Sequence, residues 1–204
     1  MVVPMRLIIS PTSPYSRKAR VLLREKGLEA IVTEVITNVY ESNLVTEYNP
    51  LGRVPVLKDQ SLNIYDSIII CQYLNNYQPD IKKSIYSLSN STWEDQIRVA
   101  LADGIIDSAL QLVIESRRPI EYQSSMIIER HTAHILRGLQ ACEEQISEYK
   151  IKFDIPEIGL ACALSYLNFR LPNINWGSKY HELYEWFEKV KQYKSMKETE
   201  FTIL

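Results

Sequence analysis

The sequence has no long hydrophobic run, no excess of one charge and few cysteines or histidines. Its apolar stretches stay well below the roughly 20 residues that a membrane-spanning helix needs, and residues 1–5 lack the basic start of a targeting signal. Its 23 Lys and Arg against 25 Asp and Glu leave a formal net charge of -2, which gives no bulk attraction to nucleic-acid phosphates. We therefore expect a soluble cytoplasmic protein with no membrane and no nucleic-acid partner.

The three cysteines and three histidines are too scattered for a metal site or a dithiol centre. No pair among Cys71, Cys142 and Cys162 has the C-x-x-C spacing of zinc or redox sites. His131 and His134 are three residues apart, with no third ligand near them. We expect no metal, and we expect cysteines that act as small buried apolar side chains.

Residues 1–78 alternate short apolar runs with helical patterns, which predicts a small α/β domain. The expected elements are strands at Met5–Ile9, Ala30–Ile36, Val54–Leu57 and Leu62–Tyr65, and helices at Pro14–Lys26 and from Asp66 or Ser67 onward. The helix between the first two strands implies a parallel pair, and the tight turn between the last two implies an antiparallel pair. The order β-α-β-loop-β-β-α therefore predicts a mixed four-stranded sheet.

Residues 79–90 are rich in Asn, Ser, Pro and Lys and form the expected linker. Residues 91–204 show helical periodicity throughout, which predicts an all-helical domain. One expected helix spans about Tyr122–Tyr149. Another is opened by Asp154 and Glu157, which have the spacing of a capping box.

The strongest local motif is Ser13-Pro14-Tyr15-Ser16, between the first strand and the first helix. It has the spacing of the thioredoxin-like redox motif, with serine at both cysteine positions. The first helical turn presents unpaired N–H groups and the positive end of the helix dipole, which stabilise a thiolate. Because the protein supplies serine there, a ligand would have to bring the sulfur. The alternative is that Ser13 is only a helix N-cap. A nucleophilic serine is disfavoured, since this domain contains no histidine to act as its base.

Two further motifs in this domain are open to more than one interpretation. Pro55 follows Val54 in a predicted strand, where proline is tolerated mainly at an edge. With a cis bond between them, the Val54 N–H and C=O could pair with a peptide ligand like an added strand. Asp66-Ser67 opens a helix and can be a simple cap, or it can bind both charges of an amino-acid end.

These three motifs occur in an order that resembles the glutathione transferase superfamily, especially small bacterial members and serine-type classes such as tau. The resemblance extends over essentially the whole chain, and includes Asn49–Leu57 (NPLGRVPVL) and Asp66-Ser67. It implies a thioredoxin-like N-terminal domain followed by an all-α C-terminal domain. It also implies glutathione as co-substrate, a small-molecule electrophile as second substrate, and a homodimer.

By the same resemblance, Ser13 is the catalytic residue and faces the glutathione sulfur. Val54 pairs with the cysteinyl unit, next to the structural cis-proline candidate Pro55. Asp66 and Ser67 hold the γ-glutamyl end, and Arg53 is a weaker candidate for the glycine carboxylate. The expected activity is attack of the bound thiolate on an electrophilic or peroxide substrate. The alternative is a non-enzymatic binding or regulatory adaptor with the same fold, because fold alone does not set function.

The first helix also carries Arg17, Lys18 and Arg20, although the helix dipole disfavours positive charge in its first turns. A basic face in contact with solvent is the favoured interpretation. An anionic ligand or a partner subunit are the alternatives.

Overall fold

The computed structural model describes residues 4–38, 43–77, 92–149 and 153–203. The chain divides into two compact units, Met1–Ser91 with Lys194–Leu204, and Thr92–Tyr193. Residues 194–204 therefore group with the α/β unit, although their helical pattern led us to expect them in the helical domain. The predicted linker 79–90 lies outside the described residues.

The first unit contains a mixed four-stranded sheet with strand order β2-β1-β3-β4. Its strands are β1 (Met5–Ile9), β2 (Val32–Ile36), β3 (Val56–Asp59) and β4 (Leu62–Ile64). Strand β1 runs parallel to β2 and antiparallel to β3, and β3 runs antiparallel to β4. This is the predicted topology. Pro55 lies just before β3 and not inside it, so it removes no donor from the sheet.

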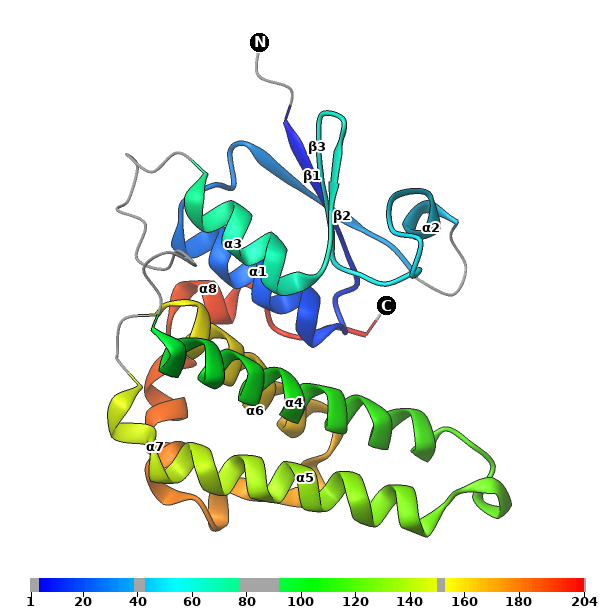
Figure 1. The fold of residues 1–204 in the computed structure, drawn as a ribbon, viewed down its shortest axis with the longest axis vertical. Helices are drawn as coiled ribbons and strands as arrows, with labels where there is room; N and C mark the ends of the chain where they lie inside the picture. The colour runs from blue at the N-terminus through cyan, green and yellow to red at the C-terminus, as the bar shows by residue number, and fades with distance from the viewer. Residues whose placement is uncertain (1–3, 39–42, 78–91, 150–152, 204) are drawn as a thin grey trace. The chain divides into compact units, whose positions relative to one another are not determined.

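Helices cover both faces of this sheet (Figure 1). The first unit contains α1 (Pro14–Glu25), α2 (Leu44–Tyr48), α3 (Ser67–Asn76) and α8 (Lys194–Lys197). Helices α1 and α3 pack against each other on one face. On the other face, Val45 of α2 packs with Ile8 and Val56 of the sheet. Alternate side chains of the central strands are therefore buried on opposite faces, which explains their nearly continuous apolar sequence.

Helix α1 begins and ends where the local sequence predicts. Ser13 is its N-cap, Pro14 is its first residue, and Gly27 follows its end with a φ of +65°. Proline loses nothing at the first helical position, since its missing N–H would have no partner within the helix. Glycine takes the left-handed conformation after a helix without steric cost. The neighbouring residues alone therefore place Ser13 at the start of α1.

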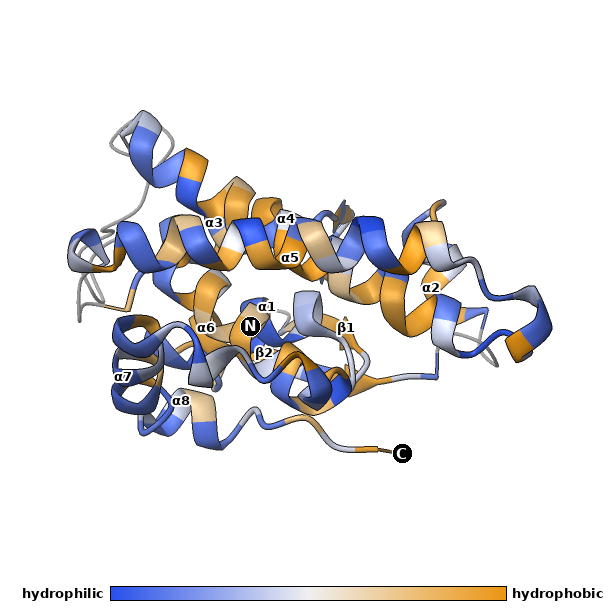
Figure 2. Ribbon diagram, turned by 90° about the horizontal axis from the view of Figure 1, so that it is seen from below, coloured by the Kyte–Doolittle hydropathy of each residue, from blue (hydrophilic) through white to orange (hydrophobic). Residues whose placement is uncertain are grey.

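The second unit is a bundle of helices joined by short 3-10 turns. The helices are α4 (Trp93–Ser116), α5 (Ser125–Glu144), α6 (Ile155–Arg170) and α7 (His181–Val190), and the turns are Ile120–Tyr122, Ile146–Glu148, Pro172–Ile174 and Trp176–Ser178. Helix α6 is the most buried of the four, with every residue from Ile155 to Leu164 buried. It is among the hydrophobic segments in Figure 2.

Two details of the second unit differ from the sequence prediction. Helix α5 is shorter than the expected Tyr122–Tyr149, because 3-10 turns replace both of its ends. Asp154 is the N-cap of α6, but its side chain makes no capping hydrogen bond. A complete capping box opens α4 instead, where Thr92 and Asp95 exchange hydrogen bonds at 3.1 and 3.3 Å.

In the described part of the chain, no helix is both long and apolar enough to cross a membrane. The same residues contain no group of three or more His, Cys, Asp or Glu that could hold a metal ion. All three cysteines are buried and none forms a disulfide.

Candidate functional site

Ser13 is half-buried at the N-terminus of α1, with one hydrogen bond used and one available. Its Oγ accepts the Ser16 backbone N–H at 3.2 Å, the ordinary N-cap contact. Within the described residues, its own O–H donates to no other group. Both interpretations of Ser13 are therefore compatible, because the cap uses a lone pair and leaves the proton for a ligand.

The first turn of α1 is electrostatically suited to an anion. It contains no acidic residue, and it lies at the positive end of the helix dipole. The Ser13 O–H lies at the same helix end. Helix starts of this kind are known environments that lower the pKa of a thiol.

Val54 and Pro55 form the second part of the site. The bond between them is cis, the isomer that the ligand-pairing hypothesis requires. Among the described residues, the Val54 backbone N–H and C=O pair with no other group. An unpaired backbone segment beside a sheet is the kind of edge to which an extended peptide binds.

Asn49 holds this segment in place, a role that the sequence analysis did not assign. Asn49 is 2% exposed. Its Nδ2 donates to the Arg53 carbonyl at 2.8 Å, and its Oδ1 accepts the Leu51 N–H at 3.0 Å. Gly52, with a φ of +62°, completes the turn. The sequence signal was the Asn-Pro-Leu-Gly run, since asparagine side chains commonly bind the backbone of the turn that they open.

Asp66 and Ser67 form the third part, at the start of α3. Asp66 is the exposed N-cap, and its Oδ1 accepts the Ile68 N–H at 3.1 Å and the Ser67 hydroxyl at 3.0 Å. The Ser67 hydroxyl is thus used within the pair, so its backbone N–H is the donor left for a ligand. The bond between Tyr65 and Asp66 is also cis.

A hydrogen bond between Tyr73 and Asp59 ties α3 to the sheet. The Tyr73 hydroxyl donates to Asp59 Oδ2 at 2.5 Å. This bond, together with burial, raises the pKa of Tyr73 to about 12. Tyr73 therefore stays protonated at neutral pH, and the contact that positions the helix is maintained.

Strand register brings the three parts to one edge of the sheet. Ile8, near the end of β1, is opposite Val56 at the start of β3, and Leu57 is opposite Ile64 at the end of β4. The segments that follow β1, precede β3 and follow β4 therefore leave the sheet at the same edge. These segments contain Ser13, Val54 and Asp66. Arg53 lies in the same loop as Val54. Its side chain is exposed and contacts no polar group among the described residues, so these contacts do not assign it a role.

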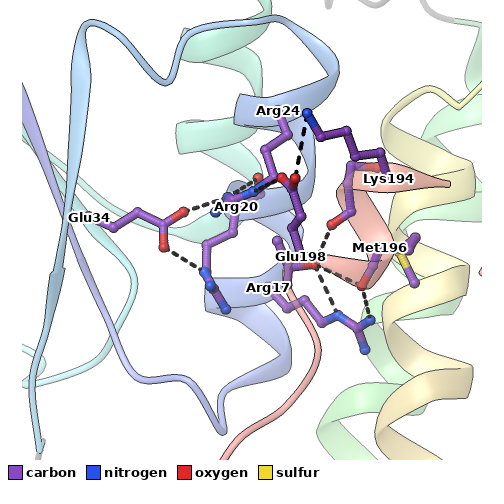
Figure 3. Close-up of polar contacts among 9 residues, drawn as sticks. Arg17, Arg20, Arg24, Glu34, Lys194, Met196 and Glu198 are labelled. Atoms are coloured by element: carbon purple, nitrogen blue, oxygen red, sulfur yellow. Dashed lines mark hydrogen bonds and ion pairs between the residues drawn. The ribbon is translucent and has the colours of Figure 1, made fainter.

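The basic residues of α1 do not form a solvated face, which corrects the sequence interpretation. Arg17 and Lys18 are only 5% and 3% exposed. Arg17 binds the C-terminal part of its own chain, and Arg20 and Arg24 form ion pairs with Glu34 of β2 at 2.9 and 2.5 Å (Figure 3). Sequence periodicity could not reveal these partners, because they lie on β2 and near the end of the chain.

Comparisons with known proteins agree with this architecture. The family model of the glutathione S-transferase N-terminal domain matches residues 12–76. The uncharacterized GST-like protein YibF of Escherichia coli (strain K12) is 36% identical over 181 residues, which are 84% of this chain and 86% of YibF.

Solved structures match over nearly the entire chain. A glutathione transferase family member from Pseudomonas fluorescens Pf-5, solved with bound glutathione, is 32% identical with a TM-score of 0.91, covering 98% of this chain and 100% of that one. A glutathione S-transferase from Methylobacillus flagellatus KT, also with glutathione bound, is 31% identical with a TM-score of 0.89, covering 97% and 100%. The first unit is thus a thioredoxin-like domain, and the second unit is the helical region that follows it in these proteins. The chain belongs to the glutathione transferase family.

Proposed function

We propose that this protein is an enzyme that binds glutathione and stabilises its thiolate for attack on an electrophilic or peroxide substrate. The observation that carries the proposal is the available Ser13 hydroxyl at the start of α1, at the same sheet edge as Val54 and Asp66. Binding of glutathione by relatives over 30% identical supports it.

Each part of the site suits one part of glutathione. The Ser13 O–H donates to the sulfur, and the unpaired Val54 backbone pairs with the cysteinyl unit. The Asp66 carboxylate binds the γ-glutamyl ammonium, while the Ser67 N–H binds the neighbouring carboxylate at a helix start. Arg53 is retained as a weaker candidate for the glycine carboxylate.

The chemistry needs no covalent bond to the protein. Glutathione loses its thiol proton to solvent, and the sulfur lone pair forms the new bond to the electrophilic carbon as the leaving group departs. With a peroxide, the sulfur attacks one oxygen and the O–O bond breaks, so the other oxygen leaves and takes a proton from solvent as an alcohol or water. The resulting sulfenic acid condenses with a second glutathione to give glutathione disulfide and water. Ser13 lowers the free energy of the anionic sulfur without accepting its proton.

Calorimetric titration of the parent protein with glutathione, paired with a conjugation assay on a chlorodinitrobenzene electrophile, tests this proposal. We expect saturable binding and enzyme-dependent formation of the conjugate. Absence of saturable binding would overturn the proposal and favour the non-enzymatic adaptor. Binding without turnover on either electrophiles or peroxides would also favour an adaptor, one that uses glutathione as a ligand.

We also propose a homodimer that forms through the face of α4. Trp93 and Ile97 are 76% and 61% exposed, and they share one helical stripe with Ala100 and Gly104. This stripe borders a groove of about 370 Å³ between α4 and α5. Exposed aromatic and aliphatic side chains beside small residues are typical of an interaction surface.

Light scattering should give twice the mass of the chain for the parent protein. We expect Ile97→Glu to give a monomer, because it places a charge in the apolar interface. Ile203→Glu, a similar change at an exposed residue outside this face, should remain a dimer. A monomeric parent would contradict the proposal.

A cytoplasmic location is consistent with both proposals. Glutathione and thioredoxin keep thiols reduced in that compartment, and none of the three cysteines forms a disulfide.

A further inference from the structure

The C-terminal segment, defined here as residues 194–203, packs into the first unit alongside α1. Its residues Ser195, Met196 and Thr199 are at most 2% exposed. The Thr199 hydroxyl donates to the Ser195 carbonyl at 2.7 Å, which closes the turn that continues α8. This segment is therefore an integral part of the α/β unit that contains Ser13 (Figure 1).

The contacts of this segment show that it runs along α1 toward the helix start. Glu198 lies 3.3 Å from Arg24, near the end of α1. The Phe201 ring lies 4.7 Å from the guanidinium of Arg17, in the second turn. The chain thus passes from the last turn of α1 to its first turns over a few residues (Figure 3).

Arg17 connects the C-terminal segment directly to the N-cap. Its backbone N–H donates to the Ser13 carbonyl at 3.0 Å. Its guanidinium donates to the Met196 carbonyl at 2.9 Å and to the Thr199 hydroxyl at 3.4 Å. A single residue, Arg17, therefore connects Ser13 to the C-terminal segment by hydrogen bonds, although about 180 residues separate the two along the chain.

The electrostatics of Arg17 argue that this link has a specific role. A cation in the first turns of a helix opposes the helix dipole, and its burial costs solvation free energy. The guanidinium offsets these costs by using its rigid set of donors on two acceptors of the C-terminal segment. An apolar side chain would bury the same surface but would not determine the position of the first turn to within a hydrogen-bond length.

We propose that the C-terminal segment holds the first turn of α1 in position, with Arg17 as a positioning residue for thiolate stabilisation at Ser13. The role toward glutathione rests on the proposed function, whereas the mechanical link does not. Hydrogen bonds to a developing charge depend steeply on geometry, and a misplacement of about 1 Å can cost as much as 100-fold in rate. Breaking the contacts between the C-terminal segment and Arg17 should therefore weaken thiolate stabilisation at Ser13, although neither group touches the sulfur.

A thiol placed at position 13 tests the link without glutathione. The Ser13→Cys variant of the full chain is alkylated with iodoacetamide over a range of pH. The three native cysteines are buried, and burial raises the pKa of Cys142 to about 11, so the rate reports the introduced thiol. We expect a pKa below the ordinary value of about 8.5.

Thr199→Val then removes one hydroxyl of the link while keeping the shape of the side chain. In the Ser13→Cys background we expect it to raise the pKa of the introduced thiol, leaving about threefold less thiolate below that pKa. Arg17→Met should leave about tenfold less, and Arg17→Lys should recover part of the loss. Because both changes break the same link, Thr199→Val should have no further effect once Arg17 is replaced.

Arg20→Met is the matched control, since its guanidinium pairs with Glu34 and not with the C-terminal segment. We expect it to leave the thiol pKa unchanged. An unchanged pKa in folded Thr199→Val would overturn the proposal, as would additive effects of Thr199→Val and Arg17→Met. If Arg17→Met does not fold, Thr199→Val alone decides. Failure of the parent to bind glutathione would overturn the proposed function only, because the alkylation assay uses no glutathione.

Discussion

Ser13→Ala is expected to lower kcat/KM for glutathione conjugation by about 100-fold, the usual effect of removing one hydrogen-bond donor from a developing anion. The donor in question is the Ser13 O–H, which no described residue uses. Without it the pKa of the bound thiol rises, so less thiolate is present at neutral pH. Glutathione affinity should change little, because Val54 and Asp66 still hold the rest of the molecule.

A spectroscopic titration of the complex measures this effect directly. The ultraviolet absorbance of the thiolate is followed against pH for the parent and for Ser13→Ala. The rise in activity with pH should move to higher pH in the variant, by the same interval as the thiol pKa. Equal thiol pKa values in the two complexes would refute the role of Ser13 while leaving glutathione binding intact.

Ser124→Ala provides the matched control. Ser124 is the N-cap of α5, where its Oγ accepts the Ile127 N–H at 3.4 Å. Both substitutions remove a serine cap and should cost about 1 kcal/mol of stability. Only Ser13→Ala should change the thiol pKa, so the comparison separates loss of the cap from loss of the donor.

Asp66→Asn is expected to weaken glutathione binding by about tenfold, the lower end of what a hydrogen bond to a charged group contributes. Asparagine is as good an N-cap as aspartate, so α3 should keep its start and the protein its stability. The change removes only the negative charge that faces the γ-glutamyl ammonium. Isothermal titration with glutathione measures the loss.

Two comparisons test the cause of that loss. A glutathione analogue without the α-amino group should bind the parent and Asp66→Asn with equal affinity, since it has no ammonium to lose. Asp154→Asn makes the same change at the N-cap of α6 and should leave glutathione binding unaltered. If Asp66→Asn weakened the analogue as much as glutathione, Asp66 would act through the local backbone and not through its charge.

The site illustrates how far local sequence rules extend. Ser13 before Pro14, and Asp66 before Ser67, could be placed at helix starts because capping depends on neighbours within three or four residues. The same rules were less successful at Asp154, where the capping hydrogen bond is absent. Residue types allow a cap there, but the surroundings of the side chain decide whether it forms.

The partners of charged and polar side chains were harder to predict than the elements themselves. Arg17 and Lys18 have the spacing of an exposed face, yet both are buried. Arg17 meets Met196 and Thr199 only because the chain returns to the first unit after the helical one. No periodicity within α1 carries information about a segment so distant in sequence.

Local sequence patterns suffice to place the elements and the chemistry at their ends: a serine at one helix start, a Val-Pro segment before a strand, and an aspartate at another helix start. These follow from backbone sterics and short-range hydrogen bonds, which depend on adjacent residues. The tertiary structure alone decided that the three motifs share one sheet edge, and that the C-terminal segment supports the helix of Ser13. Both depend on strand register and on long-range packing, whose free energy comes from residues that meet only in the folded chain.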